Sequence, residues 1–337
     1  MTQTALRDAD VAGLESEAGH VGKLATVLAH QITGPLAALL VAIVVFSATT
    51  DTFLSAGNLS LIAQQSVVVG TLALGQTLII LTAGIDLANG AIMVLGSVVI
   101  GKFALDGNPW IALVLGLLVC MAIGAINGAL VARAGLPPFI VTLGVLTVIT
   151  AAARLYSASQ SFPIADGILT ALNRGPSFDG VTLTYGVMLW VLLTFVLGYA
   201  LSQTAWGVRV YAVGDNPSAA ALTGIKVRRI LFGVYVVAAV VYTFGAWQAL
   251  GRTPTADPSG YATANLDSIT AVVIGGTSLF GGRGGVYGTL IGTLIVVVLQ
   301  NGLTQAGIDS LYQQVATGAL VIVAVGVDRL IRRRQAR

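Results

Sequence analysis

Five polar side chains stand inside or between strongly apolar stretches of the sequence. They are Asp86, Asn89, Gln64, Gln65 and Gln76. A carboxylate inside a membrane is costly and usually has a function there. Amide side chains donate and accept hydrogen bonds, which suits a neutral hydroxylated solute and equally suits bonding between helices. We interpret the five side chains as a predicted solute pathway, with interhelical hydrogen bonding as the alternative.

Asp86 has two predicted roles because it lies in a segment that can interrupt a helix. Gly84 and Gly90 flank it and permit the chain to leave helical geometry. Asp86 can face the pathway, or it can cap the helix that begins near Leu87 by accepting a hydrogen bond from a free backbone N–H group. One residue can fill both roles.

A second polar segment, residues 214–229, reads GDNPSAAALTGIKVRR. Asp215 or Asn216 can cap a short helix with Pro217 in its first turn, and Gly224 can end that helix. The small side chains give this helix a smooth face that fits a groove of a partner protein. An ordinary helical turn at the surface is the alternative.

Residues 274–288 form a glycine-rich segment, with six glycines between Gly275 and Gly285. A phosphate-binding loop is not predicted, since the segment follows no strand, contains no lysine and lies between two apolar runs. We expect a sharp turn that lets two helices approach closely, with Arg283 at the cytoplasmic face.

The residue types needed for catalysis or metal binding are sparse. The two histidines, His20 and His30, both lie near the N-terminus, and the single cysteine, Cys120, stands in an apolar run. No metalloprotease motif, nucleophile elbow or Cys/His cluster occurs. We therefore expect a protein that is not an enzyme and that binds no cofactor or metal ion.

The elements that carry these residues are predicted to be membrane-spanning helices. Hydrophobic residues make up 56% of the 337 residues and charged residues only 9%, against about 25% charged residues in soluble domains. The runs are continuous rather than alternating, which excludes a β-barrel. Several are short or interrupted by glycine, which predicts broken helices. The predicted spans are 34–49, 60–83, 88–105, 110–132, 138–157, 185–203, 230–250, 267–280, 286–302 and 313–331.

The positions of Lys and Arg predict the orientation, since basic residues concentrate on the cytoplasmic side. Most of the 17 basic residues fall on one set of loops, including clusters at 226–229 and 329–337. Ten crossings with both termini in the cytoplasm place both clusters inside. We thus predict an all-α polytopic bundle of about ten segments in a bacterial inner membrane.

Three regions are predicted along the chain. Residues 1–33 form a cytoplasmic tail or an amphipathic helix and not a signal peptide, because they contain acidic residues and no early apolar core. Residues 34–331 form the transmembrane domain, and residues 332–337 form a basic cytoplasmic C-terminus.

Four segments together resemble the permease family of ribose-, xylose- and galactose-type bacterial ABC importers. The resemblance extends from about residue 34 to residue 334, and its last two segments are the most specific. The segments are GIDLANG (84–90), LPPFIVTLG (136–144), GVRVYAVGDNPSAAALTGIKVRRI (207–230) and TAVVIGGTSLFGGRGGVYGTLIGTLIVVVLQNGL (270–303).

This resemblance implies a permease subunit that translocates a small sugar while a separate subunit hydrolyses ATP. It implies three partners: an ABC ATPase, a periplasmic or lipid-anchored sugar-binding protein, and a second permease in a homodimer or heterodimer. It also implies that residues 214–224 contact the ATPase. The residues carried over to this role are Gly214, Asn216, Ala219, Ala220 and Gly224.

Two alternatives are considered, one within the same class of importer and one from a different class of transporter. Related permeases carry other polar solutes, such as nucleosides or branched-chain amino acids. A secondary transporter driven by an ion gradient is disfavoured, because such proteins use intramembrane ionisable groups and Asp86 is the only acidic residue predicted at an intramembrane break. The sequence leaves the identity of the sugar open.

Overall fold

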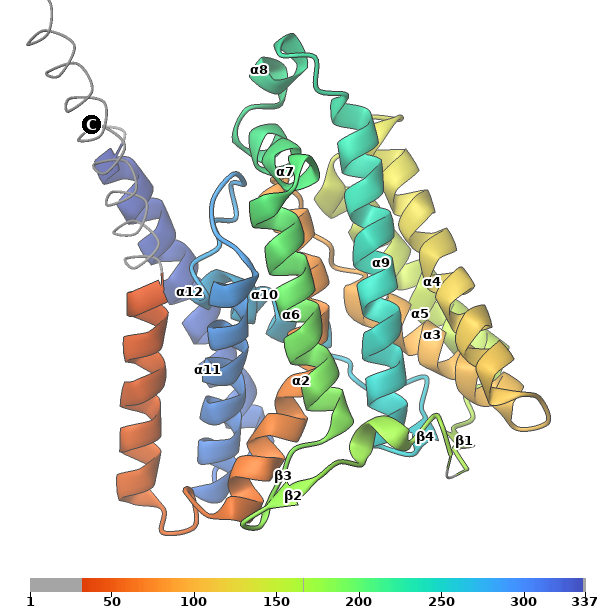
Figure 1. Cartoon of the computed structure of the whole chain (residues 1–337), viewed down its shortest axis with the longest axis vertical. Coiled ribbons are helices and arrows are strands. Elements are labelled where there is room, and N and C mark those ends of the chain that lie inside the picture. Colours follow the sequence, from red (N-terminus) through yellow and green to blue (C-terminus); the bar gives the residue numbers. More distant parts are fainter. Residues whose placement is uncertain (1–31, 166, 336–337) are drawn as a thin grey trace, which may run out of the picture.

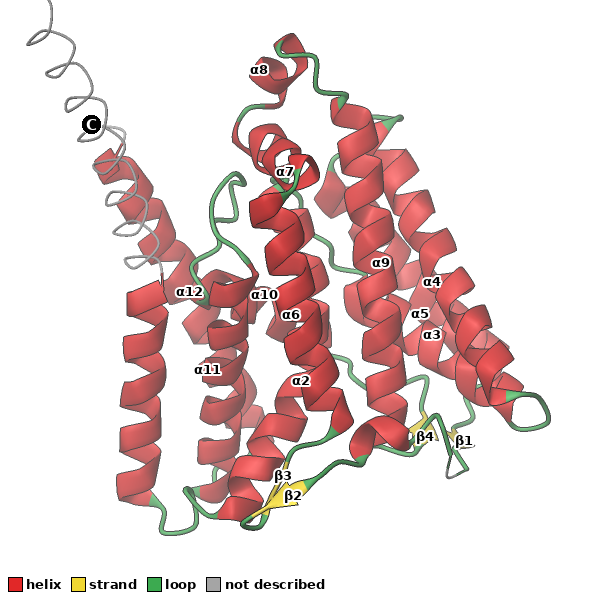
Figure 2. Ribbon diagram, in the orientation of Figure 1, coloured by secondary structure: helices red, strands yellow, loops and turns green. Residues whose placement is uncertain are grey.

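A computed structural model describes residues 32–165 and 167–335 of the chain. Nearly all regular structure in these ranges is helical (Figure 2). Seven of the described helices are long and apolar enough to cross a membrane, which confirms a polytopic helical bundle. They overlap seven of the ten predicted spans, and the total of ten crossings stays a prediction.

The described elements follow one another in this order. The helices are Ile32–Thr49, α2 (Ala56–Leu81), α3 (Asn89–Ala104), α4 (Pro109–Ala132), α5 (Pro138–Ser157), α6 (Tyr185–Gln203), α7 (Ala205–Asp215), α8 (Pro217–Leu222), α9 (Val227–Arg252), α10 (Ala264–Ile274), α11 (Val286–Gln305) and α12 (Ser310–Gln335), with a 3-10 turn at Ala171–Asn173. Two small antiparallel pairs join β1 (Phe162–Pro163) to β4 (Thr255–Ala256), and β2 (Ser177–Phe178) to β3 (Val181–Thr182). All four strands lie at the end of the bundle opposite α8 (Figure 1).

Two of the short apolar helices follow breaks in the chain. The long helix α2 ends at Leu81, and the chain stays non-helical until α3 begins at Asn89. The long helix α9 is likewise followed by β4 and irregular backbone before α10 begins at Ala264. Each short helix therefore starts inside the bundle instead of at its surface, as expected for discontinuous helices in transporters.

The two broken regions, α2–α3 and α9–α10, pack so that each short helix contacts the long helix of the other region. Helix α3 contacts α4 and α9, while α10 contacts α11 and α2, and α2 and α9 pack against each other at the centre. Glycines permit these close contacts: a Cβ atom at Gly75 of α2 would overlap the ring of Tyr242 in α9, and one at Gly124 of α4 would overlap Ala239. The core is therefore built around α2 and α9.

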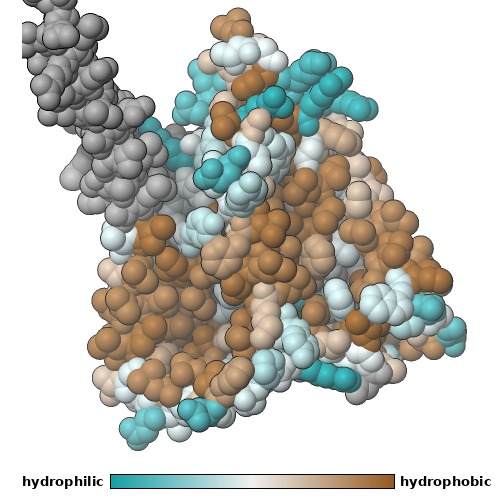
Figure 3. All heavy atoms as spheres, in the orientation of Figure 1, coloured by the Kyte–Doolittle hydropathy of each residue, from teal (hydrophilic) through white to brown (hydrophobic). Residues whose placement is uncertain are grey.

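The outer surface has the distribution of polarity expected for a membrane protein. In the view of Figure 3, hydrophobic residues form a broad band across the middle, and hydrophilic residues gather around α7, α8 and the start of α9. Exposed apolar side chains on α4, α5 and α6 contribute to this surface, among them Val114, Val148 and Phe195. A solvent of lipid explains why they are exposed.

Some predicted boundaries differ from those observed. The predicted span 267–280 is wrong at its end, because α10 stops at Ile274 and glycine-rich backbone follows. The helix α7 lies in a region for which only a polar loop was expected. Helix α12 continues to Gln335, across the predicted start of the C-terminal tail, and the first membrane helix begins at Ile32. The predicted N-terminal tail falls almost entirely outside the described residues.

Candidate functional site

The carboxylate of Asp86 is buried at the break between α2 and α3. One oxygen accepts a hydrogen bond from the Ala88 N–H group (2.8 Å), and the other accepts one from the Tyr242 hydroxyl of α9 (3.3 Å). Only 1% of Asp86 is exposed. Asp86 thus fixes the backbone just before α3 and joins it to α9, and it does not face open space in this conformation.

Asn89 connects the two broken regions of the bundle. Its side-chain nitrogen donates to the Ser268 hydroxyl of α10 (2.7 Å), which in turn donates to the Asn265 carbonyl (2.8 Å). The Asn265 side chain donates to the Leu87 carbonyl (3.1 Å). The first turns of α3 and α10 are therefore held together by polar contacts in the interior of the bundle.

The three predicted glutamines lie at different depths along α2. Gln76 is buried beside the break; with its amide oxygen toward the Asp86 N–H (3.2 Å) and its nitrogen toward the Asp86 carbonyl (3.0 Å), it satisfies both groups. Gln64 and Gln65 lie on the same helix about 16 Å away, at a rise of ~1.5 Å per residue. Gln64 lines a separate cavity of about 10 Å³ with Gln248 and Arg252. The structure therefore groups Asp86, Asn89 and Gln76 and leaves the other two glutamines apart.

The segment 214–224, which we call the coupling segment, contains the predicted short helix. The Asn216 side chain accepts a hydrogen bond from the Ala219 N–H group (3.0 Å), so Asn216 and not Asp215 caps α8, and Pro217 is its first residue. Gly224 follows the helix with φ +84°, a conformation that favours glycine. Both ends of α8 are thus encoded by local sequence.

The faces of α8 differ in exposure. Ala220 is buried, whereas Ala219 is exposed and Leu222 is 91% exposed. The predicted small-residue face did not include Leu222, because its exposure becomes visible only where the structure places α8. Figure 1 shows α8 projecting from the end of the bundle. Leu222 is thus an exposed apolar side chain on the helix that projects furthest from this end (Figure 1).

Gly214 joins the coupling segment to the end of α2 and to the glycine-rich turn. A Cβ atom on Gly214 would lie within van der Waals overlap of the Leu81 carbonyl and 2.8 Å from the Gly282 nitrogen. Gly282 itself donates a hydrogen bond to the Leu81 carbonyl (3.0 Å). The end of α7 therefore packs directly against the chain that leads into the Asp86 break.

The glycine-rich segment makes the sharp turn that its sequence predicts. Gly281, Gly282 and Gly284 all have positive φ, and Gly275 and Gly288 approach so closely that a Cβ atom on either would overlap the other's carbonyl. The Tyr211 hydroxyl of α7 donates to the Gly284 carbonyl (2.8 Å). Burial raises the pKa of Tyr211, which keeps this donor protonated. The turn is thus a close-packed connection between α7, α10 and α11.

The polar side chains of this site form hydrogen bonds within the bundle. Within the described residues no group of three His, Cys, Asp or Glu side chains is placed to hold a metal ion. The side chains that the structure brings together are hydrogen-bonded amides, hydroxyls and one carboxylate. These hydrogen bonds stabilise the breaks before α3 and α10. The contact of Gly214 with Leu81 and Gly282 joins the end of α2 to the segment that carries α8.

Comparison with known proteins identifies permeases over most of the chain. Residues 58–325 match the family described as "Branched-chain amino acid transport system / permease component". The chain is 43% identical to a fructose import permease protein of Rhizobium meliloti over 307 residues, 89% of this chain and 85% of the relative. It is 36% identical to a ribose import permease protein of Bacillus subtilis, covering 89% of this chain and 93% of the relative.

A third relative is named for another sugar, D-allose. A D-allose transport system permease protein of Escherichia coli is 33% identical over 295 residues, 85% of this chain and 87% of the relative. No solved structure matched the chain. The similarity to curated permeases thus covers both broken regions and the coupling segment.

Proposed function

Because the chain belongs to the permease family described as the branched-chain amino acid transport system permease component, we propose that it is the membrane-spanning subunit of an ATP-driven importer for a small sugar. The family description names amino acids, whereas the three relatives described above carry the names of fructose, ribose and D-allose. Identities of 33–43% over at least 85% of the chain favour a sugar as the solute. Branched-chain amino acids are the alternative that the family description supplies.

The single observation that supports coupling to a partner is the contact at Gly214. An ATPase that binds α8 moves α7, and the packing of Gly214 against Leu81 and Gly282 passes this movement to the end of α2. The chain then leads within a few residues to Asp86 and Asn89, which hold α3 against α9 and α10. A change at the ATPase thereby changes the packing of both broken helices.

The charge distribution supports an orientation for the chain. The end of the molecule that carries α8 also carries exposed basic residues, including Arg209, Lys226, Arg228 and Arg229. Basic residues favour the cytoplasm, where the ATPase subunit is located. We therefore place α8 and both termini in the cytoplasm and the four short strands on the periplasmic side of the inner membrane.

The predicted partners can be tested together by copurification. The tagged chain, extracted from its native membrane in mild detergent, should bring down an ABC ATPase, a second permease copy and a sugar-binding protein. The Leu222→Ser variant serves as the matched control, since it changes only an exposed position of α8 and should lose the ATPase selectively. Recovery of the folded chain without any ATPase would contradict the proposal.

A further inference from the structure

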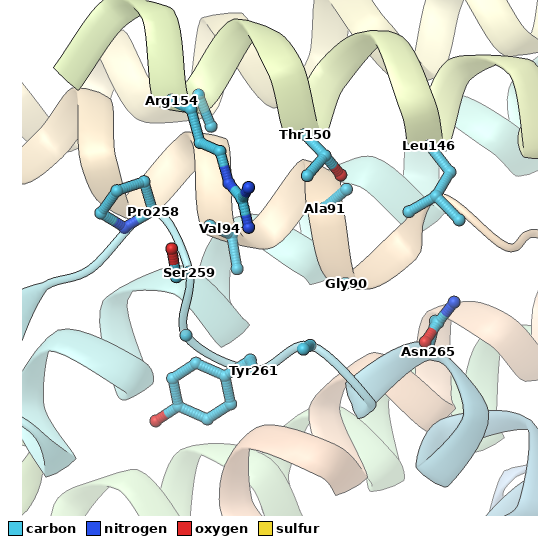
Figure 4. A pocket seen from close by; sticks show the side chains of 13 residues that line it. Gly90, Ala91, Val94, Leu146, Thr150, Arg154, Pro258, Ser259, Tyr261 and Asn265 are labelled. Carbon is cyan, nitrogen blue, oxygen red and sulfur yellow. The ribbon is translucent and has the colours of Figure 1, made fainter. Parts of the chain in front are cut away.

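A cavity of about 130 Å³ lies between the first turns of α3, the middle of α5 and the irregular chain before α10 (Figure 4). A single water needs only ~10–15 Å³ by a comparable measure, so the cavity admits a much larger group. It lies next to the contact between Asn89 and Ser268, because Gly90 and Asn265 both line it. None of the five predicted pathway side chains lines this cavity.

The polar groups around the cavity come from separate parts of the chain. Thr150 and Arg154 extend from α5 toward the cavity, and the Asn265 side chain approaches from the opposite wall (Figure 4). Ser259 and Tyr261 belong to the irregular segment. Together they provide hydroxyl, amide and guanidinium groups on more than one side of the same space.

The remaining walls are apolar or small. Val94 and Leu146 give the cavity an apolar surface, and Gly90 and Ala91 contribute small residues to its wall. A sugar has both features in one molecule, with hydroxyls at the edges and C–H groups on its faces. Binding sites for small molecules combine apolar walls with a few placed polar groups in the same way.

Arg154 determines which solutes suit the cavity. The planar guanidinium offers five N–H donors in a fixed fork, which matches two adjacent oxygen atoms. None of the residues lining the cavity is acidic. Adjacent hydroxyls of a neutral polyol can each accept a hydrogen bond from this fork. The carboxylate that borders this wall, Asp257, already accepts a hydrogen bond from the Ser259 N–H group (2.8 Å).

The backbone at Tyr261 supports a functional role for this wall. Tyr261 has φ +56°, in the left-handed region that a non-glycine residue occupies at a cost. Its carbonyl accepts the Ala264 N–H group (3.1 Å), which connects this conformation to the start of α10. The irregular segment is thus held in an unfavourable conformation where it borders the cavity.

We propose that this cavity is a binding station for the adjacent hydroxyls of a sugar, with Arg154 as the principal donor and Thr150, Ser259 and Asn265 as further partners. This inference rests on the proposed function and specifies where the solute pauses in the membrane subunit. It also explains how the solute can affect coupling, because the cavity adjoins the Asn89–Ser268 contact between the two broken helices.

The test uses cysteine protection in the assembled importer. Cys120 is fully buried, so the unmodified chain gives little background with a water-soluble methanethiosulfonate reagent. Ser259→Cys should react with the reagent, and D-fructose, D-ribose or D-allose should slow this reaction at least threefold, whichever sugar the wild-type complex imports. Leucine should not slow it. Thr150→Cys provides a second reporter from the opposite wall.

Two further variants separate a local effect from a general one. Ser177→Cys, exposed in β2 and outside the cavity, should react at the same rate with and without sugar. Arg154→Gln in the Ser259→Cys chain should abolish protection, and Arg154→Lys should restore only part of it, since lysine lacks the planar fork. Sugar import by the wild type without protection at either reporter would overturn the binding station. Absence of any sugar import by the wild type would instead refute the proposed function.

Discussion

At the residue scale, the Asp86 carboxylate holds the non-helical segment between α2 and α3 through one local and one long-range hydrogen bond. It accepts from Ala88 and Tyr242 and is almost completely buried. The sequence predicted the break from Asp86 and its flanking glycines, whereas the Asp86 carboxylate accepts from the N–H group of Ala88, which precedes α3, and not from a residue of the helix. The Tyr242 partner was not predictable, since it lies 156 residues away on α9 and only the packing of the bundle brings it there.

Replacement of Asp86 distinguishes a structural from a charge-dependent role. Asp86→Ala leaves the Ala88 N–H and the Tyr242 hydroxyl without their acceptor, so it should lower the free energy of unfolding by about 1–3 kcal/mol. Asp86→Asn retains an oxygen acceptor and should cost less and preserve transport. Thermal unfolding in detergent, together with uptake, measures both effects. A stable but inactive Asp86→Asn protein would show that the charge itself is required.

Gly214 provides a second prediction at this scale. Gly214→Ala places a Cβ atom in the Leu81 carbonyl, and the resulting displacement of α7 should destabilise the protein by about 1–3 kcal/mol and reduce coupling of ATP hydrolysis to uptake. Gly233→Ala is the control, because a methyl group added at Gly233 in α9 would meet no atom within 4 Å. Equal thermal stability and coupling in both variants would contradict the role given to Gly214.

At the scale of elements, the helices formed by long uninterrupted apolar runs were the most predictable. Their apolar runs are long, and caps such as Asn216 before Pro217 mark their ends. Helix α10 was harder, because apolar residues continue past its end while Gly275 and Gly276 already form the turn. The cavity beside Arg154 could not be predicted, since α3, α5 and residues 258–265 converge only in the folded bundle.

At the scale of elements, we predict that α8 contributes to binding of the ATPase. Leu222→Ser should weaken binding of the ATPase about tenfold or more, because a buried leucine contributes about 1.5–3 kcal/mol, and it should leave the fold intact since Leu222 is 91% exposed. Leu54→Ser, at a 57% exposed position near the opposite end, is the control. Titration of the purified ATPase against the permease measures both affinities. Unchanged affinity in Leu222→Ser would remove Leu222 from the interface.

At the scale of the whole molecule, the distribution of basic residues favours the proposed orientation. The α8 end is basic, the opposite end carries the short strands, and two broken regions meet between them. Composition predicted the membrane bundle, which the structure confirms, and the direction that the charge pattern favours stays a prediction. The reciprocal packing of α3 on α9 and of α10 on α2 has no signature in composition.

Labelling from one side of the membrane tests this orientation. In intact cells, an impermeant thiol reagent should modify Ser177→Cys and should modify Ser218→Cys only after the inner membrane is opened. Both positions are exposed, and buried Cys120 supplies little background. The reverse pattern would invert the topology and place α8 out of reach of a cytoplasmic ATPase.

ATP-dependent sugar uptake in proteoliposomes tests the central claim most directly. Vesicles that contain the permease, its ATPase and its binding protein should accumulate D-fructose, D-ribose or D-allose only when ATP is supplied to the ATPase, and omission of any component should abolish accumulation. Sugar uptake by the permease alone without ATP, or ATP-driven uptake of leucine with no uptake of a sugar, would contradict the account.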